Sequence, residues 1–115
     1  MMNNPYDFAH GLARSLRESD VFVEMKKLKS EIESNESYKE MLKGYHQLHI
    51  EMQTVRMQGI EPTDEFKERA EKTTLAIQGI PVIMQYLQAE ERLSILLNDI
   101  QKIMLEPVQE IMDFS

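Results

Sequence analysis

The stretch from Pro81 to Leu105 constrains the fold of this 115-residue chain more than any other part of the sequence. It has no glycine and no proline after its first position, and Pro107 follows just past its end. At about 1.5 Å per residue it predicts a helix of roughly 35 Å. Its apolar positions span an arc of roughly 200°, wider than the ~100° stripe that covers one core. Such a helix needs several neighbours, and a second copy of the chain can supply some of them.

The remaining sequence also predicts helices, because glycine and proline are scarce and Glu, Lys, Leu, Met and Gln are frequent. Capping residues predict helix starts after Asn4, after Ser19 or Asp20, after Asn35 and at Thr63. The third helix is expected from about Glu36 to Gln58, with Gly59 as its stop. Breaks in the pattern predict an interruption at Gly79-Ile80-Pro81 and a separate short last helix over Val108 to Phe114.

The third expected helix carries a strict seven-residue repeat of apolar side chains. These are Tyr38, Met41, Tyr45, Leu48, Met52 and Val55. Such a repeat indicates a helix that lies along another at a shallow angle, and the short connection to Thr63 predicts an antiparallel neighbour. The expected fold is therefore all-α, with one domain over residues 1–115: a long antiparallel helical hairpin or bundle with short N- and C-terminal helices, self-associating as a dimer.

Composition excludes several classes of function. Lys and Arg number 13 against 20 Asp and Glu, a formal charge of −7, which argues against direct nucleic-acid binding. The absence of cysteine excludes disulfides, thiolate zinc sites, iron–sulfur ligation and a cysteine nucleophile. No secretory signal and no apolar run of 18 residues is seen, so we expect a cytoplasmic protein without a membrane segment.

Glu90 is the most informative polar residue, because it falls within the apolar arc of the 81–105 helix. A buried carboxylate needs a partner. Arg92, Arg69 or a basic residue of a partner chain could pair with it and so specify register. A role as a general acid is the alternative, but no second catalytic group accompanies it.

His46 and His49 stand three residues apart, a spacing that can present two imidazoles to a metal ion. Glu90 is the best third ligand, which gives an alternative hypothesis of a metal-dependent helical-bundle enzyme. The Glu-x-x-His signature of di-iron bundles is absent. No phosphate-binding loop or nucleophile arrangement occurs either, so the sequence predicts neither an enzyme, nor a cofactor, nor a small-molecule substrate.

Two pairs of apolar residues lie off the expected core faces. Ile50 and Met57 are one heptad apart, away from the seam of the third helix, and Met84 and Ile95 share the polar side of the 81–105 helix. Together with Glu90, these are the candidate contacts to a second copy or to an unidentified protein partner.

Several ordered segments carry a family resemblance. They run from Pro5-Tyr6-Asp7 through the Phe22–Leu28 stretch and Gln58-Gly59 to the segment Gln88-Ala89-Glu90-Glu91-Arg92-Leu93-Ser94, which is followed by Leu97, Ile100, Ile103 and Pro107. Together these resemble the YlbF/YheA/YmcA family of small helical proteins of Gram-positive bacteria, and the YheA branch most.

The resemblance implies an all-α, self-associating protein without known catalysis. Some members are linked to competence, sporulation and biofilm development, assist the RNA-degrading machinery and can carry iron–sulfur clusters. This chain has no cysteine to ligate a cluster. That difference favours the YheA branch and a non-enzymatic interaction or regulatory role.

Overall fold

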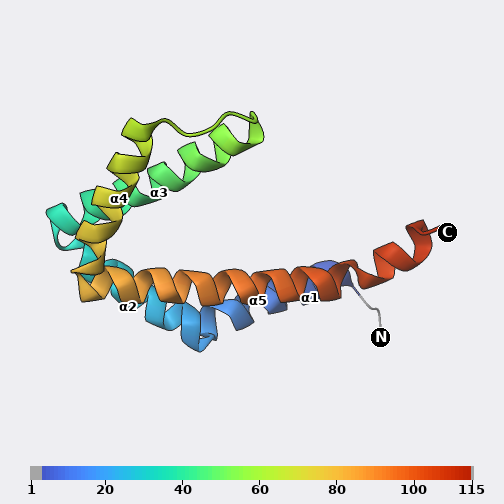
Figure 1. Ribbon diagram of the computed structural model, residues 1–115. Coiled ribbons are helices and arrows are strands. Elements are labelled where there is room, and N and C mark those ends of the chain that lie inside the picture. The colour runs from blue at the N-terminus through green and yellow to red at the C-terminus, as the bar shows by residue number, and fades with distance from the viewer. Residues whose placement is uncertain (1–3, 115) are drawn as a thin grey trace. The chain divides into compact units, whose positions relative to one another are not determined.

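The computed structural model describes residues 4–114, which form five helices and no strand (Figure 1). The helices are α1 (Pro5–Glu18), α2 (Asp20–Glu33), α3 (Glu36–Met57), α4 (Asp64–Gln78) and α5 (Pro81–Met112). The predicted all-α class is confirmed.

The chain divides into two compact units. The central unit, Lys27–Tyr86, contains the end of α2, all of α3 and α4, and the start of α5. The terminal unit joins the chain up to Lys26 to the chain from Leu87 onward, so it contains α1, the start of α2 and most of α5. Helices α2 and α5 therefore each contribute to both units.

The helices begin where short polar side chains cap their first amides. The side-chain oxygens of Asn4, Asn35 and Thr63 each accept a hydrogen bond from an amide two or three residues ahead, at 2.9 to 3.1 Å. Between Ser19 and Asp20, the structure selects Ser19, whose Oγ lies 3.4 Å from the amide nitrogen three residues ahead. These caps satisfy donors that have no partner within the helix, as the sequence predicted.

Helix α3 ends in a turn that requires glycine. Gly59 has a φ of 72°, a conformation that side chains with a Cβ rarely adopt. The amide of Ile60 then donates to the carbonyl of Val55 at 3.1 Å and closes the helix end. Residues 58–63 reverse the chain, and α3 and α4 pack against each other as the predicted hairpin.

The interruption around Gly79 is a break between two helices. Helix α4 ends at Gln78, with Gly79 as its C-cap, and α5 starts at Pro81. Proline suits the first position of a helix, because its missing N–H has no acceptor there.

The expected separate helix over Val108 to Phe114 is wrong: α5 continues through Pro107 to Met112. Figure 1 shows the ribbon of α5 changing direction near this end. A proline inside a helix removes one hydrogen bond, to the carbonyl four residues earlier, at Ile103. Residues on both sides of Pro107 are exposed, so water can satisfy that carbonyl.

The core of the described residues lies mainly in the central unit. Leu28, Ile32, Ile77 and Ile83 are buried there, whereas Ala89 is the one buried residue that the structure describes in the terminal unit. The six heptad positions of α3 are all half-buried, which confirms that this seam faces inward, and no residue of α3 is fully buried. One copy of the chain therefore covers its apolar faces only in part.

Candidate interaction surfaces

A hollow of about 190 Å³ in the central unit collects basic side chains in an otherwise acidic chain. Its walls come from α2, α3 and the start of α5, and its lining residues are Lys29, Ile32, Glu33, Lys39, Leu42, Lys43, His46 and Tyr86.

The charges around this basic hollow are partly balanced by neighbours on the same helices. Lys29 lies 3.6 Å from Glu33, and Lys43 lies 3.7 Å from Glu40. The volume is also below the ~300–1,000 Å³ typical of small-molecule sites. The hollow therefore lacks the size and the concentrated charge of a strong anion site.

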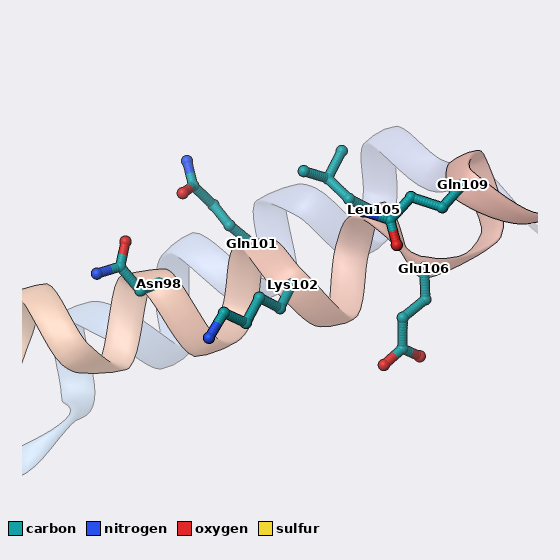
Figure 2. A pocket seen from close by; sticks show the side chains of 6 residues that line it. All are labelled: Asn98, Gln101, Lys102, Leu105, Glu106 and Gln109. Atoms are coloured by element: carbon teal, nitrogen blue, oxygen red, sulfur yellow. The ribbon is translucent and has the colours of Figure 1, made fainter. Parts of the chain in front are cut away.

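A second hollow lies on α5, beside Pro107. Its lining residues all belong to this one helix: Asn98, Gln101, Lys102, Leu105, Glu106 and Gln109 (Figure 2). Ligand sites generally bury most of their ligand between convergent groups from several elements. This open surface of one helix does not have that form.

The two histidines pack around an aromatic ring. The rings of His49 and Tyr45 have centroids 4.4 Å apart, and those of His46 and Tyr45 are 6.2 Å apart. Within residues 4–114, no three His, Cys, Asp or Glu side chains gather as a metal ion would require. The structure thus gives no support to the metal-enzyme hypothesis for His46, His49 and Glu90.

Glu90 is half-buried, and the described residues include no fully buried charged side chain, so the expected buried carboxylate is wrong for the single chain. Both arginines proposed as its partners form ion pairs with other carboxylates. Arg69 Nη2 lies 2.7 Å from Glu51 Oε2, and Arg92 Nη2 lies 2.5 Å from Glu24 Oε2. The first pair joins α4 to α3, and the second joins α5 to α2.

The four apolar candidates for a protein contact differ in exposure. Ile50, Met57 and Ile95 are largely exposed, and Met57 reaches 88%, whereas Met84 is half-buried. Ile50 and Met57 share α3, two turns apart, near the end of the α3–α4 hairpin. Ile60, also exposed, follows directly after the turn at that end and was missed by the sequence interpretation.

A larger exposed apolar surface lies in the terminal unit. Most apolar side chains in the last part of α5 are exposed, among them Leu97, Ile103, Met104, Leu105, Val108, Ile111 and Met112. Tyr6 and Phe8 of α1 are exposed as well. The sequence interpretation placed the α5 positions up to Leu105 on an apolar arc too wide for one core, and periodicity shows that a face is apolar but not what covers it.

The helical fold with its exposed apolar faces agrees with the comparisons to known proteins. The family profile described as "Control of competence regulator ComK, YlbF/YmcA" matches residues 6–109. The chain belongs to the YlbF/YmcA family. Within this family, a UPF0342 protein of Alkalihalophilus pseudofirmus is 39% identical over 110 residues, which cover 96% of this chain and 93% of that protein. The UPF0342 protein YheA of Bacillus subtilis is 34% identical over 111 residues, with coverages of 96% and 95%.

Two solved structures share the YlbF/YmcA-family fold described above. YheA from Bacillus subtilis superimposes with a TM-score of 0.68 at 28% identity, covering 95% of this chain and 99% of that chain. A protein of unknown function (DUF964) from Bacillus stearothermophilus gives a TM-score of 0.75 at 20% identity, with coverages of 96% and 97%. The predicted resemblance, including its YheA branch, is confirmed. Among residues 4–114, no helix is both long and apolar enough to cross a membrane.

Proposed function

We propose that this protein is a non-catalytic regulatory module that acts by binding other proteins, as a dimer of two identical chains. The observation that carries the proposal is the number of large apolar side chains exposed along ordered helices, on both units. Contiguous exposed apolar surface on a folded protein is typical of contact sites for other proteins.

The family supplies the biological context of the proposal. The description of the family profile names control of the competence regulator ComK. This chain would act in regulation of that kind, as an adaptor protein in developmental control or RNA processing. The formal charge of −7 favours protein partners over direct contact with nucleic acid.

The exposed pair Ile50 and Met57 is the proposed contact for a protein other than a second copy. Both side chains lie on α3 of the central unit, and their exposure leaves them available to a partner. Exposed anchors of this size can dominate the free energy of binding once a partner excludes water from them.

Affinity capture from a native lysate of the source bacterium tests this proposal. We expect the wild-type chain to retain the same protein in repeated experiments, and a variant with Ile50→Glu and Met57→Glu to lose it. Val23→Glu is the matched control, because Val23 is a similarly exposed apolar residue on another helix. A wild-type bait that reproducibly returns only itself contradicts the proposal, as does a partner that the double variant retains unchanged.

A further inference from the structure

The basic hollow of the central unit is apolar inside and basic at its opening. Ile32 is buried in its wall, and Leu42 and Tyr86 are half-buried there. The side chains of Lys29 and Lys43 are 65% and 63% exposed, so their charged groups lie at the rim. The hollow therefore offers a small apolar interior surrounded by positive charge.

The size of the basic hollow suits a single side chain. Its volume of about 190 Å³ is below that of small-molecule sites, which is ~300–1,000 Å³. Peptide segments commonly bind folded proteins by placing single anchor side chains in such pockets, while the neighbouring residues contact the rim. The anchor has to be apolar, because the side chains of Ile32 and Leu42 offer no hydrogen-bond partner to a polar one.

The rim selects acidic neighbours for that anchor. Lys29, Lys39, Lys43 and Glu33 are the lysines and the acidic residue of the lining, a positive balance in a chain where acidic residues outnumber basic ones by 20 to 13. Lys39 is half-buried and forms no ion pair with any residue between 4 and 114. Its ammonium group is therefore available to a carboxylate from outside the chain.

The two ion pairs already present at the rim can be exchanged. Lys29 lies 3.6 Å from Glu33, and Lys43 lies 3.7 Å from Glu40, beyond the ~2.7–2.9 Å of a charge-assisted hydrogen bond. All four side chains are more than half exposed, so solvent screens both pairs and each contributes little to stability. A carboxylate of a partner can replace Glu33 or Glu40 at low cost.

We propose that the basic hollow docks a segment of another protein in which one large apolar side chain stands between acidic residues. The apolar side chain enters the interior, and the lysines of the rim bind the flanking carboxylates. The inference deepens the proposed function, on which it rests for its partner being a protein. It adds the chemistry of the bound segment and a surface that shares no residue with the Ile50–Met57 contact.

A nucleic acid fits the basic hollow less well. Phosphate groups gain nothing from an apolar interior, and strong binding to nucleic acid requires several phosphates to be neutralised at once. None of the lining residues, all of which lie within residues 4–114, is an arginine, the side chain best suited to bidentate phosphate binding. The acidic balance of the whole chain also opposes a polyanion.

Fluorescence anisotropy with the purified full-length chain and synthetic peptides tests the proposal. The probe is a labelled peptide with a central leucine flanked on each side by three glutamates. One control peptide has alanine at the centre, and a second has lysines in place of the glutamates. We expect the probe to bind with a Kd below about 1 mM, at least about tenfold more tightly than either control, and more weakly at high salt. No measurable binding, or equal binding of the alanine peptide, overturns the proposal.

Charge reversal in the chain identifies the surface. Lys39→Glu combined with Lys43→Glu should weaken binding of the probe at least about tenfold and strengthen binding of the lysine-flanked peptide, which also shows that the variant is folded. Lys27→Glu combined with Lys67→Glu is the matched control, because both lysines are exposed outside the hollow and the net charge changes equally. The control should change the affinity less than about twofold. Equal losses in the two variants assign binding to net charge and overturn the site.

The same probe separates this inference from the proposed function. Ile50→Glu combined with Met57→Glu should leave probe binding unchanged, because neither residue lines the hollow, and loss of binding overturns the site. A chain that captures a protein through Ile50 and Met57 but does not bind the probe overturns this inference alone. Probe binding without reproducible capture from a lysate overturns the adaptor role and leaves the site intact. A single-stranded RNA that displaces the probe at lower concentration than the unlabelled acidic peptide assigns the hollow to phosphate groups and overturns the proposal.

Discussion

Arg92 of α5 donates to Glu24 of α2 across 68 positions of sequence, with Nη2 and Oε2 2.5 Å apart. The pair joins the two separate parts of the chain that make up the terminal unit. Arg92 belongs to the segment by which the sequence most resembles its family. Both side chains are about half exposed, so solvent screens the interaction.

This exposure predicts a small energetic contribution from the pair. We expect a double-mutant cycle of Glu24→Gln and Arg92→Gln to give a coupling free energy of about 0.2–1 kcal/mol, as is typical of exposed ion pairs. Urea unfolding of the four proteins measures it, and the value should fall at high salt. A coupling of several kcal/mol that salt does not change would contradict this account.

The nearly complete burial of Ile77 predicts a large loss of stability when its side chain is shortened. Its side chain is 1% exposed, and Ile77→Ala is expected to lower the free energy of unfolding by about 2–4 kcal/mol through lost burial and a cavity. Leu75→Ala, two residues earlier on α4 at 60% exposure, should change it by less than about 0.5 kcal/mol. Chemical denaturation of both variants provides the comparison, and equal losses would show that α4 is packed differently.

Alanine substitutions at Gly44 and Gly59 are expected to change the free energy of unfolding in opposite directions. Gly44 lies inside α3 with no atom within 4 Å of an added Cβ, so Gly44→Ala should raise the free energy of unfolding by about 0.5–1 kcal/mol. Gly59 has the positive φ, so Gly59→Ala should lower it by about 1 kcal/mol. Thermal unfolding followed by circular dichroism distinguishes them, and a gain at Gly59 would contradict the turn described for α3.

Pro81 and Pro107 allow a matched pair of alanine substitutions in α5. Pro107→Ala restores a hydrogen bond inside the helix, and we expect amide exchange over residues 108–112 to slow about tenfold, or by ~1.4 kcal/mol. Pro81 is the first residue of α5, where a backbone N–H has no acceptor within the helix. Pro81→Ala should therefore change the amide exchange rates in the first turns of α5 by less than about twofold. Hydrogen exchange measures both, and unchanged rates after Pro107 would show that proline does not weaken this end.

Local features of the fold could be predicted from the sequence. Asn4, Asn35 and Thr63 cap helices as expected, because a cap depends on a side chain and an amide two or three residues away. The heptad positions of α3 all turn inward for the same reason: their spacing alone puts them on one side of the helix.

Features that depend on neighbours in space were predicted less well. Ala89 is fully buried although its neighbours in the sequence are polar. Its small side chain allows another part of the chain to pack closely against α5, and the surrounding sequence does not predict this contact. Glu90 is half-buried, and Arg69 and Arg92, two of the three kinds of partner considered for it, form ion pairs with other carboxylates. The sequence indicated that the apolar arc of the 81–105 helix is too wide for one core, but it did not show which of its positions stay exposed, because that depends on neighbours in space.

The discontinuity of the terminal unit has a consequence for synthesis on the ribosome. The central unit is one continuous segment that ends at Tyr86, so all of it is made before Leu87 is added. Helices with mostly local contacts form quickly compared with translation at about 5–20 residues per second. The terminal unit can be completed only after Leu87 and the residues that follow it are made, because α1 belongs to that unit together with most of α5.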